Sequence, residues 1–427
     1  MPMLVSALVL EWLRGERWGR AVRVLVPLAA MVVEGWPALL GALLIQEGGL
    51  WLTGRLVEPC QRAFGRGLFL AAFGLRVAIA LPTHYVAKLS DGNGALFQDD
   101  YTNDLVGEWL VRIARGDGIS IFPGHQHLLD GFYPYLLMGL YSVFGYSPLL
   151  PKLLNTGLAA LSAVLIFEIA RRTFRLRSAV LAAIGAALLP TMIVWSIVTL
   201  KESLVLCVSL LGLWAVQSLS VTARRDERFM SLVVVLVGVL ALLLDLRLSA
   251  AGILLCLAIA TYFVKSRHRL RPWQVAIAVV GLVAIAGGGL WTVRARTTNR
   301  PITAVVEDAV LTIRHRRAQE AASASSRIRT EADVFSATGS EIPASEAASD
   351  AAPFSISGDV LEPLGYALLA PAPWQARSTP ELGAAAEMPV WYVLLGASLL
   401  AWRSAPRQPF FVVCLAAYGV ANWLVLA

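Results

Sequence analysis

Long runs of apolar residues recur from one end of the chain to the other, separated by short polar gaps. An α-helix needs roughly 20 apolar residues to cross the hydrocarbon core of a bilayer, and most of these runs approach that length. Membrane helices satisfy their backbone hydrogen bonds internally, so we expect the irregular polar connections to lie outside the hydrocarbon. The pattern predicts spans at about 68–87, 148–170, 178–198, 202–221, 229–246, 248–264, 273–293, 387–402 and 409–426.

The composition supports the same class of protein. Of 427 residues, 57% are hydrophobic and only 15% are charged, which is too apolar for a soluble protein of this size. The net charge of +7 does not indicate nucleic acid, because the basic residues cluster in short gaps between apolar runs, where they orient helices. The four cysteines show no disulfide or metal-binding spacing. We therefore expect an all-α polytopic membrane protein.

The short gaps differ strongly in basic charge, and this difference predicts the orientation. Thirteen Lys and Arg residues fall in gaps on one side, whereas the short gaps on the other side contain only Lys201 and Arg247. The positive-inside rule assigns the thirteen to the cytoplasm. Two long loops, 88–147 and 294–386, are then predicted on the outer face. The thirteen are Arg171, Arg172, Arg175, Arg177, Arg224, Arg225, Arg228, Lys265, Arg267, Arg269, Arg271, Arg403 and Arg407.

The chain divides into four parts on this pattern. Residues 1–62 are predicted to form an amphipathic or re-entrant segment, and we favour a hairpin because arginines flank both of its ends. Residues 63–293 form the transmembrane core and carry the first outer loop. Residues 294–386 form the second, which is partly flexible because of its Ala/Ser-rich stretch. Residues 387–427 form the last helices.

The first outer loop contains the candidate chemistry. Asp99 and Asp100 follow an apolar span, and Tyr101 comes directly after them. A carboxylate at the bilayer surface has the chemistry of a general base that takes a proton from an acceptor hydroxyl or amine. The alternative is that both are solvated loop acids. Asp104 is expected to be a helix cap or a solvated residue. An amphipathic helix is expected at 105–113 and a surface helix at 132–144.

Basic residues at the outer ends of the spans are candidates for holding a phosphate. Lys201 precedes Glu202, and the pair is either a helix-end anchor or a phosphate contact with a second polar group. Arg247 is expected either to pair with Asp245 or to bind phosphate, to which the arginine fork is well suited. No metal site is predicted, because the pair His125 and His127 has no further ligand nearby in sequence. The phosphate-binding candidates are Lys201, Glu202, Arg247, Arg294, Arg296 and Tyr101.

Over about 68–225 the outer acidic pair is followed by Tyr133–Leu136, by Leu140–Pro148, and by a span that ends in Phe167–Phe174. This order of elements resembles the GT-C membrane glycosyltransferases, of the dolichyl-phosphate-mannose protein mannosyltransferase and aminoarabinose transferase kind. A weaker similarity follows at Pro371–Gln375 and at Glu387–Met388. Each motif has low specificity, so the order and the topology carry the resemblance.

The resemblance implies a GT-C-like helical bundle and inverting transfer of a sugar from a polyprenyl-phosphate donor to a protein, lipid or polysaccharide acceptor. The base would be Asp99 or Asp100, without a metal or other cofactor. The expected location is a bacterial cytoplasmic (inner) membrane, with the site on the periplasmic face. Relatives of this kind continue through further helices, so the resemblance implies that this chain, which ends at Ala427, is C-terminally short or truncated. The alternatives are a transporter of lipid-linked sugars or a non-catalytic membrane partner subunit.

Overall fold

A computed structural model describes residues 16–91, 94–117, 131–221, 227–247, 250–255 and 257–259. This part of the chain is helical and contains no β-strand. The all-α prediction is therefore confirmed for the described residues. The predicted spans at 273–293, 387–402 and 409–426, and the loop 294–386, lie outside them.

Among the described residues, four helices are long and apolar enough to cross a bilayer, as expected of an integral membrane protein. They are α4 (Arg62–Asp91), α7 (Leu149–Thr173), α10 (Glu202–Val221) and α11 (Glu227–Leu246). The ends of α7, α10 and α11 match the predicted spans within three residues, whereas α4 extends about five residues beyond its predicted span in both directions.

The span predicted at 178–198 is broken, so the prediction of one continuous helix there is wrong. The structure has α8 (Leu176–Leu188) and α9 (Pro190–Ser196), which meet at an angle of 53°. Proline disfavours helical geometry in the residue before it, and Leu189 is accordingly non-helical with a ψ of 122°. After α9 the chain leaves helical structure and runs through residues 197–201 to the start of α10.

Residues 16–56 form a helical hairpin of α2 (Glu16–Glu34) and α3 (Trp36–Leu56). The turn is at Gly35, whose φ of 77° suits glycine, and Pro37 begins the second helix. The two helices are antiparallel, because Gln46 donates to the carbonyl oxygen of Arg23 over 3.2 Å. A short 3₁₀ turn, η1 (Pro59–Gln61), then leads into α4.

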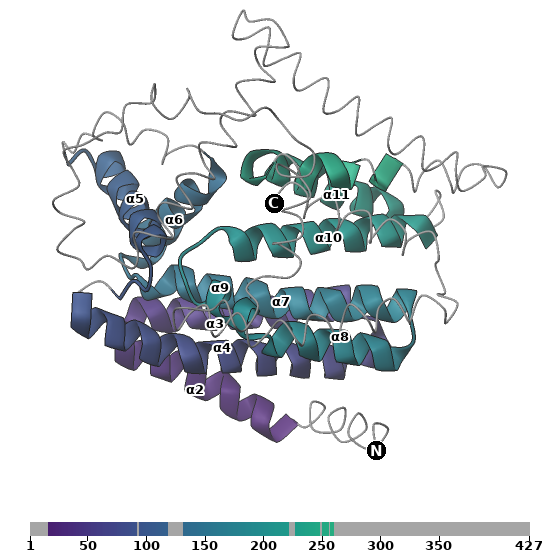
Figure 1. The fold of residues 1–427 in the computed structure, drawn as a ribbon, viewed down its shortest axis with the longest axis horizontal. Coiled ribbons are helices and arrows are strands. Elements are labelled where there is room, and N and C mark those ends of the chain that lie inside the picture. The colour runs from purple at the N-terminus through teal and green to yellow at the C-terminus, as the bar shows by residue number, and fades with distance from the viewer. Residues whose placement is uncertain are drawn as a thin grey trace, which may run out of the picture. The chain divides into compact units, whose positions relative to one another are not determined.

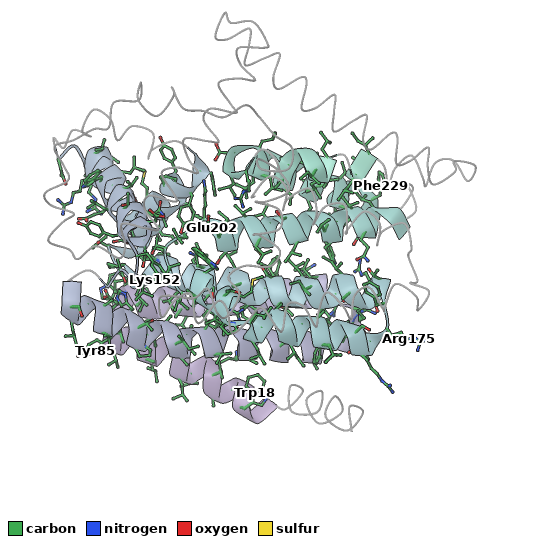
Figure 2. All side chains as sticks on the ribbon, viewed as in Figure 1. Trp18, Tyr85, Lys152, Arg175, Glu202 and Phe229 are labelled. Atoms are coloured by element: carbon green, nitrogen blue, oxygen red, sulfur yellow. The ribbon has the colours of Figure 1, made fainter. Side chains whose placement is uncertain are left out.

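The helix α7 is the centre of this bundle. It contacts α3, α4, α8 and α10, and it is buried on nearly all sides. Figure 1 shows these long helices running along one another, with α5 (Gln98–Arg115) and α6 (Phe132–Phe144) packed together near the end where α7 begins. Lys152 and Glu202 lie towards that end, whereas Arg175 lies at the other (Figure 2). The 25 residues of α7 separate the two ends by about 37 Å at 1.5 Å per residue.

The predicted surface helix at 132–144 coincides with α6. The helix expected at 105–113 is longer than predicted, since α5 already begins at Gln98. Asp99, Asp100 and Asp104 therefore lie on a helix rather than in a loop, and this changes what each of them contacts.

Candidate functional site

A pocket of about 290 Å³ lies at the end of the bundle opposite Arg175. Its size is at the lower end of the range for small-molecule sites. The first turns of three helices line it, together with the last turn of α11. Its lining residues are Asp99, Thr102, Asn103, Gly131, Phe132, Tyr133, Pro134, Leu200, Lys201, Glu202, Asp245 and Leu246.

The two adjacent aspartates have different surroundings. Asp99 is exposed and lines the pocket, and no described residue forms an ion pair with it. Asp100 is only 1% exposed, and the ammonium of Lys152 lies 2.9 Å from its Oδ2 atom. Lys152 is itself 1% exposed. The carboxylate of Asp100 is thus neutralised inside the protein, as a buried charge requires.

Asp100 also accepts two backbone hydrogen bonds that tie separate segments together. The N–H of Leu96 donates to Oδ2 over 2.9 Å, and the N–H of Thr199 donates to Oδ1 over 2.8 Å. Lys152 donates in addition to the carbonyl oxygen of Gly94 over 2.5 Å. Asp100 and Lys152 therefore hold the segment before α5 and the segment before α10 against α7.

The irregular segment 198–200 is held by further side chains. The Nδ2 atom of Asn155 donates to the carbonyl oxygens of Val198 and Leu200 over 2.6 and 2.8 Å. Asn103 donates to the carbonyl oxygen of Thr199 over 3.0 Å. Buried backbone groups outside helices need such partners. Because this segment leads directly into Lys201, these bonds fix one wall of the pocket.

Asp104 is neither a cap nor solvated, so that expectation is wrong. It is 4% exposed and accepts hydrogen bonds from the hydroxyl of Tyr141 and, over 2.6 Å, from that of Tyr146. Burial raises the pKa of the Asp104 carboxyl above its ordinary value, while the two hydroxyls act to lower it. Asp104 lies four residues after Asp100 and shares its buried helix face.

The structure brings Lys201 and Glu202 into the pocket with Asp99. Lys201 is exposed, and no described residue forms an ion pair with it. The carboxylate of Asp245 accepts a hydrogen bond from the backbone N–H of Phe132 at the start of α6. This contact replaces the ion pair expected between Asp245 and Arg247. Arg247 is half-buried and does not line the pocket.

The remaining candidate residues either do not line the pocket or lie outside the described residues. Tyr101 is exposed and is not one of the residues that line the pocket. Arg294, Arg296, His125 and His127 lie outside the described residues. Within the part that the structure describes, no three carboxylate, imidazole or thiol side chains are grouped so as to hold a metal ion.

A second, mostly apolar pocket of about 200 Å³ adjoins the first, and Glu202 lines both. Arg76 of α4 reaches it, together with Trp195 of α9 and Ser203 of α10. The guanidinium of Arg76 is 1% exposed and donates to the carbonyl oxygens of Ala72, Ala186 and Ala187 over 2.9 to 3.1 Å. No described carboxylate pairs with it, and its Nε atom is buried without a partner in the described part.

Comparisons with protein-family models, with curated proteins and with solved structures find no match. The function is therefore inferred from the residues of the site itself.

Sequence reasoning missed the residues that support the pocket. Lys152 and Asn155 are polar residues near the outer end of an apolar run and three positions apart, so they share one helix face. Ionisable residues inside membrane helices are costly and are therefore candidates for a function. That signal was present for Lys152 and for Arg76. In the sequence Tyr133 is singled out only as part of the motif Tyr133–Leu136, whereas in the structure it lines the pocket.

Proposed function

We propose that this chain is a membrane glycosyltransferase that uses a polyprenyl-phosphate sugar at the outer, periplasmic leaflet of a bacterial cytoplasmic membrane. The observation that carries the proposal is the pocket in which Asp99, Lys201 and Glu202 meet at the end of the bundle opposite the arginines. The positive-inside rule assigns the arginine-rich end to the cytoplasm. The pocket is then accessible from the outer face.

The adjoining apolar pocket supports a lipid-linked substrate. A polyprenyl-phosphate sugar has a polar head and an apolar tail, and here a polar and an apolar pocket share the wall formed by Glu202. Lys201 in the polar pocket and Arg76 in the apolar one provide positive charge for the phosphate between head and tail. Arg247, Arg294 and Arg296 stay candidates for the same task.

Asp99 is the better of the two candidate bases. Its carboxylate lines the pocket, whereas both oxygens of Asp100 are engaged by Lys152 and by backbone N–H groups. In the proposed reaction Asp99 takes the proton of the acceptor hydroxyl or amine. The acceptor atom then forms a bond to the anomeric carbon as the bond between that carbon and the phosphate oxygen breaks. The phosphate leaves with the electron pair, and the configuration inverts.

The test is replacement of the base in the full chain. Membranes containing wild type, D99N or D100N would be given radiolabelled polyprenyl-phosphate hexose and pentose, and release of polyprenyl phosphate would be measured. We expect D99N to lose a factor of about 10² to 10⁴ in rate, the usual contribution of a general base. D100N is expected to lose folding stability together with activity. Full activity in D99N refutes the assigned base, and no release by wild type with either donor argues for a transporter or a scaffold.

A further inference from the structure

Tyr133 is the most deeply buried polar side chain that lines the pocket. It is 4% exposed, and it is the second residue of α6. Its ring packs in the apolar cluster that also contains Leu137 and Leu213. The ring therefore anchors the residue, while the hydroxyl lies beside Asn155, which holds the pocket wall at 198–200.

The hydroxyl of Tyr133 has a proton to donate. Its one hydrogen-bond contact among the described residues is with the Nδ2 atom of Asn155 at 3.5 Å. The two protons of that amide are directed to the carbonyl oxygens of Val198 and Leu200 at shorter distances. No described residue accepts the tyrosine proton. A buried hydroxyl without an acceptor costs free energy, so this donor is available to a ligand.

The Tyr133 hydroxyl is suited to donate and not to act as a base. Burial raises its pKa well above the ordinary value, and the nearby charges of Glu202, Asp100 and Asp104 raise it further. The phenol therefore keeps its proton at neutral pH, where it can donate a hydrogen bond.

The pocket also has a backbone environment that favours an anion. Asp99 is in the first turn of α5, Tyr133 in that of α6, and Glu202 in that of α10. The amino-terminal ends of helices carry partial positive charge. Three such ends line one pocket of about 290 Å³. Among the described side chains of its lining, Lys201 is the single cation, beside the carboxylates of Asp99, Glu202 and Asp245.

The geometry points to Tyr133 as a catalytic residue that donates a hydrogen bond to the departing phosphate oxygen. This inference rests on the proposed glycosyl transfer. As the anomeric carbon–oxygen bond breaks, the phosphate gains the electron pair and its charge grows. A fixed neutral donor then binds the leaving group more strongly than it binds the intact donor substrate. Tyr133 complements Lys201 because it is buried and positioned, whereas Lys201 is exposed.

The test compares Y133F with Y135F in the full chain, reconstituted in nanodiscs of phosphatidylethanolamine and phosphatidylglycerol. Phenylalanine keeps the ring contacts of Tyr133, and the lost 3.5 Å contact is too long to affect folding. Tyr135 is on the same helix but is exposed and does not line the pocket. Binding of free polyprenyl phosphate measures affinity for the charged leaving group without turnover. With heat-treated membranes supplying the acceptor, the rate at which polyprenyl phosphate is released gives kcat and KM for the sugar donor.

We expect Y133F to bind polyprenyl phosphate about tenfold more weakly, as for loss of a hydrogen bond to a charged group. Its kcat should fall on the order of a hundredfold, with KM for the donor changed by less than threefold. Y135F should match wild type in all three quantities. If Y133F binds polyprenyl phosphate as tightly as wild type does, or if only its KM changes, the role assigned to Tyr133 is overturned.

The design separates this inference from the proposed function. D99N should keep polyprenyl-phosphate binding while losing transfer. If wild type turns over and Y133F equals it, glycosyl transfer stands and the role of Tyr133 is refuted. If wild type has no transferase activity but its binding of polyprenyl phosphate depends on Tyr133, the anion subsite stands and the transferase proposal is refuted.

Discussion

Removal of Lys152 is the sharpest test of the scaffold behind the pocket. K152M replaces the lysine with an apolar side chain of similar length. The carboxylate of Asp100 then loses its only cationic partner among the described residues. The two side chains are 2% and 1% exposed, so water cannot replace the ammonium without local opening. The carbonyl oxygen of Gly94 also loses a donor.

The magnitude follows from burial and from the bonds that remain. Breaking a buried ion pair on one side costs about 3 to 5 kcal/mol, because an uncompensated charge stays inside. The N–H groups of Leu96 and Thr199 still donate to Asp100 at 2.9 and 2.8 Å, which argues for the lower half of that range. The matched control is R112M on α5, the helix that carries Asp100. Arg112 pairs with Glu108 four residues away and is 50% exposed, and such pairs contribute about 0.3 to 0.5 kcal/mol.

The assay measures the free energy of unfolding of the reconstituted chain in bicelles by steric trapping. It compares wild type with K152M, R112M, D100N and the double variant D100N/K152M. The double variant should recover part of the loss seen in K152M, since it no longer buries an unpaired carboxylate. A loss of 1 kcal/mol or less in K152M, similar to that in R112M, would refute the view that the Asp100–Lys152 pair holds the pocket together.

Two further substitutions test neighbouring parts of the scaffold. Because burial raises the folded-state pKa of Asp104 above its usual 3.8, the stability linked to this carboxyl is present below that usual value and is lost as pH rises through the folded pKa. D104N should lack this decline in unfolding free energy, and equal pH slopes for D104N and wild type would contradict the burial argument. G94A should cost roughly 2 to 4 kcal/mol, because its φ is +76° and the added Cβ would lie 2.2 Å from the His84 ring. In the control G116A, at a φ of +83° with no neighbour within 4 Å, only the backbone cost of about 1 to 2 kcal/mol applies, and equal losses in the two variants would contradict the clash with His84.

Most of the described spans could be predicted because hydropathy marks where a long apolar helix begins and ends. The runs that became α7, α10 and α11 are bounded by polar or charged residues, so their ends are visible in the sequence within a few positions. The break between α8 and α9 was missed for a physical reason. A window of hydropathy averages over Pro190, which is apolar, and gives no weight to its missing N–H.

The roles of Asp99 and Asp100 could not be separated from composition or from their order. In an α-helix successive side chains point about 100° apart, so the separation follows only once α5 is known to begin at Gln98. Asp99 then faces the pocket, and Asp100 faces Lys152. With the helix start in hand, the i to i+4 spacing of Asp100 and Asp104 would have predicted that both share one buried face. Their partners on α7 and α6 are far away in sequence and needed the fold.

The acidic residues of the pocket also have an explanation without catalysis, namely stabilisation of helix amino-terminal ends. Asp99 and Glu202 are in the first turns of α5 and α10, where a carboxylate is favoured by the helix dipole by roughly 0.3 to 1 kcal/mol. Such a role predicts that D99N loses at most that much stability and leaves any reaction unchanged. Proton abstraction predicts the reverse, a large loss of rate with folding nearly intact. Helix capping does not require Lys201 and Tyr133 to line the same pocket as these carboxylates, whereas an acid–base reaction on a phosphate-linked substrate needs such donors beside a carboxylate.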